Sequence, residues 1–192
     1  MIKKVMFVMV GMLFSVNAWA ATYTGTFDSD DNVVYVQLDL AEDSLIQFES
    51  FGYAGGTMSD GSVVADGGFD SVLHLFQPFG TEILVQDDGA SRVSASSGSS
   101  YDFLAQMYLT AGQYFIAITQ YANFWDGSAW SGAQTDGFVD VGGYTRTNQY
   151  AFEYTVLSSG GVSAVPVPAA LFLFAPALLG FLGFRRKASQ AA

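Results

Sequence analysis

Acidic side chains dominate the charged groups of this chain that could bind a ligand, with 18 Asp and Glu against 7 Lys and Arg. Asp28, Asp30 and Asn32 alternate as at the start of an EF-hand calcium loop. The sixth position of that loop requires Gly, but here it is Val33, which opens an alternating run typical of a strand. The pattern excludes an EF-hand and leaves open a looser Ca²⁺ site between turns, with candidate ligands Asp30, Asp31, Asp87 and Asp88. The alternative is that these carboxylates only shape solvated turns.

Residues 121–130 form the densest aromatic segment outside the two chain ends, Tyr-Ala-Asn-Phe-Trp-Asp-Gly-Ser-Ala-Trp. Aromatic faces can stack on sugar rings while neighbouring amides and carboxylates hydrogen-bond to hydroxyl groups. The segment is therefore a candidate glycan-binding loop, and 136–148, which contains Asp140 and Arg146, is a candidate second wall. The alternative is that the rings fold down as a small apolar cluster beneath the loop. The candidate ligand-binding residues are Tyr121, Phe124, Trp125 and Trp130.

Catalytic patterns are lacking in this sequence. The single histidine, His74, lies within the alternating run Val-Leu-His-Leu-Phe, where we expect it to be an ordinary strand residue. Neither a G-x-S-x-G elbow nor an H-E-x-x-H motif is present. A carboxylate pair could serve glycoside hydrolysis, but among 18 acids some pair will lie close by chance. We expect no enzyme and assign no catalytic residue; a secreted hydrolase is the least favoured of three hypotheses.

Alternating apolar and polar residues predict the elements that must position these groups. Gly-rich turns separate the alternating runs, and no stretch before residue 165 keeps a helical period over three turns. We therefore predict an all-β fold, a jelly-roll-like antiparallel β-sandwich spanning residues 21–157. Long Gly-, Ser- and Asp-rich or aromatic loops are expected at 54–71, 87–101 and 122–148. The predicted strands are 33–40, 44–51, 72–76, 82–86, 102–109, 113–121 and 149–157.

The order of short motifs over roughly half the chain resembles the pre-peptidase C-terminal-like β-sandwich of secreted bacterial proteins. That resemblance implies a sandwich in which hairpin turns frame core strands, and a role as an export or binding accessory. The matching pieces are Gly25-Thr26-Phe27, Asp30-Asp31-Asn32, Gly68 to Phe76, Gly80 to Val85, Asp87-Asp88-Gly89 and Leu109 to Tyr114.

The N-terminus has the three parts of a secretory signal peptide. Lys3 and Lys4 supply positive charge, an uncharged apolar run follows, and Ala18-Trp19-Ala20 matches an A-x-A cleavage site. The apolar run is shorter than a membrane span requires. We therefore expect residues 1–20 to be a signal peptide cleaved after Ala20, with Ala18 and Ala20 as the cleavage-site residues.

The C-terminus combines a proline motif, an apolar span and a basic end. Ser158-Ser159-Gly160-Gly161 begins an expected flexible linker, 158–164. Residues 165–184 are uncharged and about long enough to cross a membrane, with the transmembrane helix expected at 169–184. The segment 165–192 resembles the PEP-CTERM sorting signal in its VPxPAA form, with Val167 in place of the name-giving Glu. The resemblance implies processing by an exosortase-like membrane protease; the alternative is a permanent single-pass anchor. The expected sorting residues are Val165, Pro166, Val167, Pro168, Arg185, Arg186 and Lys187.

Charge and composition limit the partners of the exported part. All 18 acids lie within residues 21–164, where the only basic residues are Arg92 and Arg146, so its net charge is 2 − 18 = −16. Such a surface disfavours nucleic acid and anionic membranes, whereas calcium and neutral polysaccharides are compatible with it. We expect an inner-membrane-anchored intermediate during sorting, then a cell-surface or extracellular protein with a structural or interaction role in the exopolysaccharide layer or biofilm. The alternative function is a carbohydrate-binding module that uses the 121–130 loop.

Overall fold

The computed structural model describes residues 19–134 and 136–160. The expected signal-peptide residues before Trp19, including Ala18, and the expected sorting segment 165–192 lie outside this range. Within it, all regular secondary structure is β-strand, as the sequence predicted. No helix in the described part of the chain has the length and apolar character to cross a membrane.

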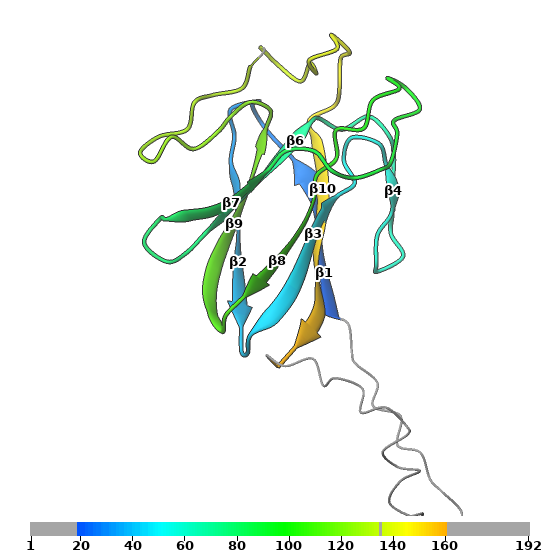
Figure 1. Ribbon diagram of the computed structural model, residues 1–192. Helices are drawn as coiled ribbons and strands as arrows, with labels where there is room; N and C mark the ends of the chain where they lie inside the picture. Colours follow the sequence, from blue (N-terminus) through cyan, green and yellow to red (C-terminus); the bar gives the residue numbers. More distant parts are fainter. Residues whose placement is uncertain (1–18, 135, 161–192) are drawn as a thin grey trace, which may run out of the picture. The chain divides into compact units, whose positions relative to one another are not determined.

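Two four-stranded antiparallel sheets face each other around one apolar core, an arrangement consistent with a β-sandwich (Figure 1). The first sheet has the order β1-β10-β3-β8 and the second the order β2-β9-β6-β7, while β4 and β5 form a separate two-stranded ribbon. The strands are β1 (Trp19–Thr26), β2 (Val34–Leu40), β3 (Ser44–Ser50), β4 (Gly56–Thr57), β5 (Val63–Val64), β6 (Ser71–Phe76), β7 (Glu82–Gln86), β8 (Leu104–Leu109), β9 (Gly112–Gln120) and β10 (Gln149–Ser159).

Period-two alternation produces the core. In β3, Ile46 and Phe48 are fully buried, whereas the alternate residues Gln47 and Glu49 point to the other face. The inner faces of both sheets contribute in the same way, and the buried cluster closes without a cysteine. Its members are Leu38, Leu40, Ile46, Phe48, Leu73, Leu75, Phe103, Ala105, Leu109, Tyr114, Ile116, Ile118, Phe152 and Tyr154.

All seven predicted strands are present, half of their ends coincide with the predicted ones and the rest shift by one or two residues, and the structure adds strand β1. Residues Trp19 to Thr26 pair along their whole length with β10, where Tyr23 stacks on Phe152 at 5.0 Å. The strand begins with Trp19 and Ala20, which the expected cleavage would remove. β10 also extends further than predicted, because Ser158 and Ser159 of the expected linker pair with β3.

The loop predicted at 54–71 contains the β4–β5 ribbon, a structure that the sequence did not predict. Met58 is buried against Phe51 and Ala151 in a second, smaller apolar cluster. The backbone N–H of Ser59 donates to Glu153 Oε2 at 2.8 Å, which fastens the ribbon to β10. Local packing therefore orders a segment whose Gly and Asp content suggested only turns.

Buried Arg146 joins the three long loops. Its guanidinium donates to the carbonyl of Gly68 at 2.9 Å and to Ser96 Oγ at 2.9 Å, and forms an ion pair with Asp66 at 3.2 Å. The same group lies over the ring of Tyr53, 3.9 Å from its centroid. Arg146 is thus a structural hub and does not contribute to the expected second wall of a glycan site.

Candidate functional site

Strand register gathers aromatic rings on the outer face of the sheet β2-β9-β6-β7. Phe76 of β6 pairs with Phe115 of β9, and Tyr35 of β2 and His74 of β6 both pair with Ala117 of β9. Paired residues of antiparallel strands point to the same side, so these side chains share one face. Tyr35 is 57% exposed, whereas His74 and Ala117 are fully buried although they lie on the outer face.

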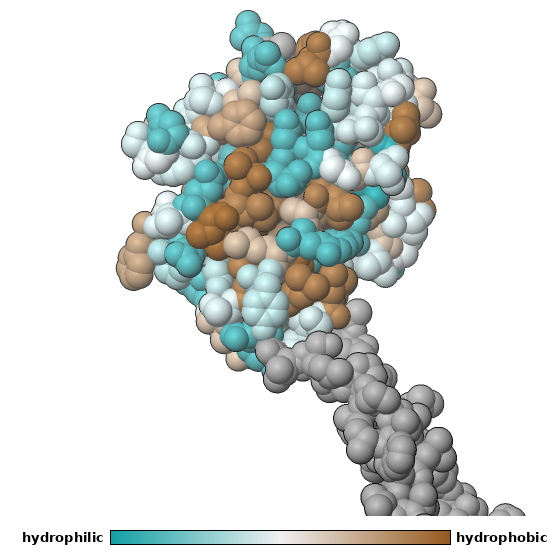
Figure 2. Space-filling view, viewed as in Figure 1, coloured by the Kyte–Doolittle hydropathy of each residue, from teal (hydrophilic) through white to brown (hydrophobic). Residues whose placement is uncertain are grey.

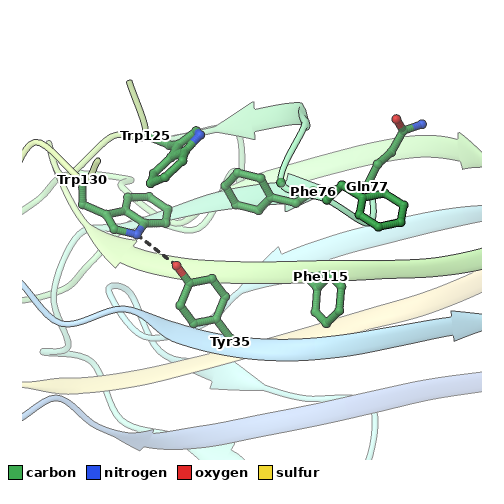
Figure 3. Close-up of a pocket in the computed structure, with 8 residues that line it drawn as sticks. Tyr35, Phe76, Gln77, Phe115, Trp125 and Trp130 are labelled. Atoms are coloured by element: carbon green, nitrogen blue, oxygen red, sulfur yellow. Dashed lines mark hydrogen bonds between the residues drawn. The ribbon is translucent and has the colours of Figure 1, made fainter. Parts of the chain in front are cut away.

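The segment that follows β9 covers this face and explains that burial. Trp125 and Trp130 form an isolated antiparallel bridge, and their ring centroids lie 5.4 Å apart. Trp130 sits edge-on over His74 at 4.8 Å. Its indole Nε1–H donates to Tyr35 Oη at 3.0 Å, and in Figure 3 the Trp130 ring lies between Trp125 and Tyr35. The loop is therefore tied to the sheet and holds its two indoles in place.

Short-range hydrogen bonds set the shape of this loop. Asp126 Oδ1 accepts from the backbone N–H groups of Ser128 and Ala129 at 2.8 and 2.7 Å, which closes the turn between the two tryptophans. These bonds to the charged form hold the pKa of the exposed Asp126 below its usual value. Fully buried Asn123 anchors the base of the loop, since its Oδ1 accepts from the N–H of Gly132 at 2.8 Å.

The rings enclose an open aromatic cleft of about 280 Å³. Figure 3 shows Trp125, Trp130 and Phe76 along one side, with Tyr35 and Phe115 facing them. Figure 2 shows that apolar surface also gathers in the middle of the face drawn there, framed by polar residues. The complete lining of the aromatic cleft is Tyr35, Phe76, Gln77, Phe79, Gly80, Phe115, Trp125 and Trp130.

Two of the four predicted glycan-binding residues, Trp125 and Trp130, line the cleft. Tyr121 and Phe124 do not; they pack edge-to-face against each other at 5.7 Å, and Phe124 contacts His74 at 6.1 Å. The segment thus divides its aromatic residues between support for the loop and the walls of the cleft. Tyr121 and Phe124 thus form the expected apolar cluster beneath the loop, whereas glycan binding by Trp125 and Trp130 stays a prediction.

Phe79 stands at the edge of the cleft without any packing of its own. It is 104% exposed, and its φ of 75° lies in the left-handed region that bulky residues rarely adopt. It occupies the turn between β6 and β7, which projects on the same side of the molecule as the 121–134 loop, at the left in Figure 1. A residue with unfavourable backbone geometry and no packing contributes little to folding, so its ring is available to a ligand.

A more polar hollow adjoins the aromatic cleft, and Trp125 and Phe79 line both. Glu82 and Asp126 line the polar side. Glu82 Oε1 lies 2.6 Å from His74 Nδ1. The other ring nitrogen, His74 Nε2, lies 3.3 Å from Thr119 Oγ1. Burial holds the pKa of His74 below its ordinary value, and Trp130 separates the ring from the cleft. Aromatic surface beside carboxylate oxygens matches the chemistry of a sugar, which has apolar faces and hydroxyl donors.

The other end of the same sheet carries an acidic cluster. Asp70 precedes β6, and Asp87 and Asp88 follow β7; one carboxylate oxygen from each lies within 4.8 Å of the others. Asp70 is only 5% exposed, and burial together with the charges of Asp87 and Asp88 raises its pKa to about 9. Burial and the charge of Asp88 raise the pKa of Asp87 to about 6. Negative charge is therefore costly here unless a proton or a cation neutralises it.

Asp30 and Asp31, the other two predicted calcium ligands, belong to no such group within the described residues. Asp31 Oδ1 accepts from the backbone N–H of Ala133 at 2.8 Å, and Asp30 Oδ2 accepts from that of Gly137. These carboxylates fasten the segment after β9 to the β1–β2 turn. The structure thus separates the two predicted pairs and adds Asp70 to Asp87 and Asp88.

Sequence reasoning missed four rings of the cleft, although each had a signal. Tyr35 interrupts the polar face of a predicted strand, and Phe79 lies at the tip of a Pro-Phe-Gly turn, where a bulky ring is unusual. Phe76 and Phe115 belong to predicted strands, but only the register reveals that they are neighbours.

A scan against models of protein families finds no match, and a search of curated proteins likewise finds no relative of this chain.

Proposed function

We propose that this protein is an exported, non-enzymatic interaction domain that binds polysaccharide of the cell exterior through the aromatic cleft. The observation that carries the proposal is the set of six rings that line one open cleft, two of them held in place by a hydrogen-bonded loop. Rigid aromatic walls lose little entropy when they bind, which suits the flat apolar faces of sugar rings.

The charge of the domain supports a neutral polysaccharide as the ligand. With a net charge of −16 over residues 21–164, the surface repels acidic polymers at low ionic strength. The two carboxylates beside Trp125 accept hydrogen bonds from hydroxyl groups and need no charged partner. Glu82 and Asp126 are both engaged with their own neighbours, which favours binding over hydrolysis as the role of this surface.

The strand order supports a jelly-roll topology as the framework. The eight strands of five or more residues pair as β1-β10-β3-β8 and β2-β9-β6-β7, so that successive strands alternate between sheets except at the β6–β7 hairpin. Two interlocking Greek keys of this kind are the basis of the jelly roll, a fold frequent among lectin domains. The resemblance in fold class alone does not specify a ligand.

The termini support an exosortase-type route to the exterior, with the membrane as a transient location. Intact mass of the mature protein combined with cell fractionation tests this part of the proposal. We expect a secreted or surface product that begins at Ala21 and ends near residues 166–170. A full-length C-terminus held in the inner membrane would instead identify a permanent anchor.

Binding is tested by affinity electrophoresis and co-sedimentation with neutral polysaccharides such as cellulose, mannan and mixed-linkage β-glucan. We expect Tyr35→Ala to weaken retention at least about tenfold, since aromatic anchors dominate binding free energy. Tyr108→Ala is the matched control, because Tyr108 is 52% exposed but lies on β8 of the other sheet. Equal retention of the two variants, or no retention of the wild type on any polymer, would refute the proposal.

A further inference from the structure

Three carboxylates that flank the two strands of one hairpin meet at the end of the sheet opposite the cleft. The chain from Asp70 to Phe76 spans six residues of β6, about 20 Å, so the acidic cluster and the cleft are separate places. The pairing of β6 with β7 begins at Leu73 and Gln86 and runs toward the connecting turn. The residues before β6 therefore lie beside the residues after β7. The convergence of Asp70, Asp87 and Asp88 follows from this register.

Unpartnered oxygens distinguish this cluster from an ordinary acidic surface. Asp70 Oδ1 and Asp87 Oδ1 are both buried atoms without a hydrogen-bond partner, and Asp70 as a whole is 95% buried. Two further buried oxygens without partners, Ser71 Oγ and Gln120 Oε1, belong to residues that pair across β6 and β9 at this same end of the sheet. Buried polar groups are almost always satisfied, so such a concentration of free acceptors points to a cation as their partner.

The two basic side chains of the domain do not supply that ligand. Arg146 forms an ion pair with Asp66, and Arg92 with Glu49; Arg92 also approaches Asp102 at 3.9 Å. Among the described residues no ion pair involves the three clustered aspartates. Asp102, which is close enough to raise the pKa of Asp88, already accepts from Ser50 Oγ at 2.8 Å and from the N–H of Ala54 at 2.9 Å.

The geometry and donor type fit calcium. Oxygens bound to one Ca²⁺ at 2.3–2.6 Å lie no more than about 5 Å apart, and the three carboxylate oxygens lie within 4.8 Å of one another. All available donors are oxygens, as hard cations prefer, and the exposed Asp88 leaves room for water in the remaining positions. Zinc and copper would favour nitrogen or sulfur ligands, which this group lacks.

We propose that Asp70, Asp87 and Asp88 form a Ca²⁺ site, with Ser71 and Gln120 as neighbouring oxygen donors. The ion would close the open end of the β6–β7 hairpin and neutralise the buried carboxylate. It would also stabilise the start of the segment after β9, because the N–H of Tyr121 donates to the carbonyl of Asp70 at 2.9 Å. This inference is independent of the proposed glycan binding.

The test compares the melting temperature of the purified full chain in EDTA and in about 5 mM CaCl₂, with isothermal titration of CaCl₂ into metal-stripped protein. We expect one site and a rise in melting temperature of about 5 °C, as binding to the folded state alone stabilises it. Magnesium at the same concentration should give a smaller shift, because it requires a nearly ideal octahedral shell.

Two variants and one control locate the ion. Asp70→Asn and, independently, Asp87→Asn should abolish the calcium-induced shift, whereas Asp31→Asn should retain it. Asp31 is a matched control because its carboxylate, which accepts from the backbone N–H of Ala133, lies outside the cluster. No calcium-induced shift in the wild type, a shift that survives in both cluster variants, or its loss in Asp31→Asn would each overturn the proposal. An equal effect of magnesium would contradict the assignment to calcium.

Discussion

The two ends of β6 differ in how completely their polar groups are satisfied. At the Phe76 end, rings stand half open to solvent, Trp130 Nε1 donates to Tyr35 Oη, and no lining residue carries a buried side-chain polar atom without a partner. At the Asp70 end, carboxylate oxygens are buried and lack partners. An open apolar region whose buried polar atoms are hydrogen-bonded suits a large ligand. A buried group of carboxylates without a positive partner suits a small cation. The two ends of one hairpin thus differ in the chemistry of the ligand that we propose for each.

The largest expected effect comes from Trp130→Ala, which tests whether the cleft is also part of the fold. The indole covers His74 and donates to Tyr35, so its removal should lower the free energy of unfolding by about 2 kcal/mol, less than for a fully buried Trp. Urea denaturation measures this change, and polysaccharide retention should fall in parallel. Retention at the wild-type level in the folded variant would show that the cleft is not the binding surface.

The acidic end should respond in the opposite direction. Asp70→Asn removes a buried carboxyl that is held unpaired, so in EDTA the variant should be more stable than the wild type by about 1–2 kcal/mol at pH 8. Asp39→Asn, at an exposed strand position with hydrogen-bonded oxygens, serves as the control and should change stability by less than about 0.5 kcal/mol. A destabilised Asp70→Asn protein in EDTA would mean that the carboxylate has a partner in the folded state.

Phe79→Asn separates binding from folding within the cleft. Asn tolerates the left-handed backbone better than Phe does, and no packing is lost, so stability should rise by about 0.5–1 kcal/mol. Retention on a neutral polysaccharide should nevertheless fall by about threefold to tenfold, as one wall of the cleft is lost. If Phe79→Asn raised both stability and polysaccharide retention, Phe79 would not belong to the binding site.

Much of this comparison was accessible from the sequence, because alternation depends on local chemistry. The runs that became β2, β3 and β6 showed their inner faces directly, and Trp125 and Trp130 were found by their density. The acidic cluster was also within reach: strands 72–76 and 82–86, folded about the Pro-Phe-Gly turn, place the residue before one strand opposite the residues after the other. Asp30 and Asp31 were predicted as calcium ligands because they are neighbours along the chain, whereas Asp70 is brought to Asp87 and Asp88 only by strand pairing.

Other features could not be deduced from local pattern. Strand β1 gains its stability from pairing with β10, more than 120 positions away in the chain, and its first residues lie in an expected cleavage site. The burial of Arg146 likewise depends on three loops that meet only in the folded state. Long-range contacts decide both, and a single sequence carries no register for them.

The smallest expected effect is a pH dependence that distinguishes the two ends of β6. Beneath the cleft, burial holds the pKa of His74 below its unfolded value, so the unfolded chain binds the proton more readily and acid destabilises the fold from about pH 6.5 downward. His74→Gln should therefore lose less stability than the wild type between pH 7 and about pH 5.5, by about 1 kcal/mol or less. The raised pKa of Asp70 acts in the reverse sense in metal-free protein, since there the folded state binds the proton more tightly. Urea denaturation of His74→Gln and Asp70→Asn in EDTA measures how the stability of each variant changes with pH relative to the wild type. If both variants differed from the wild type in the same direction, the contrast between a buried neutral base and a buried unpaired acid would be contradicted.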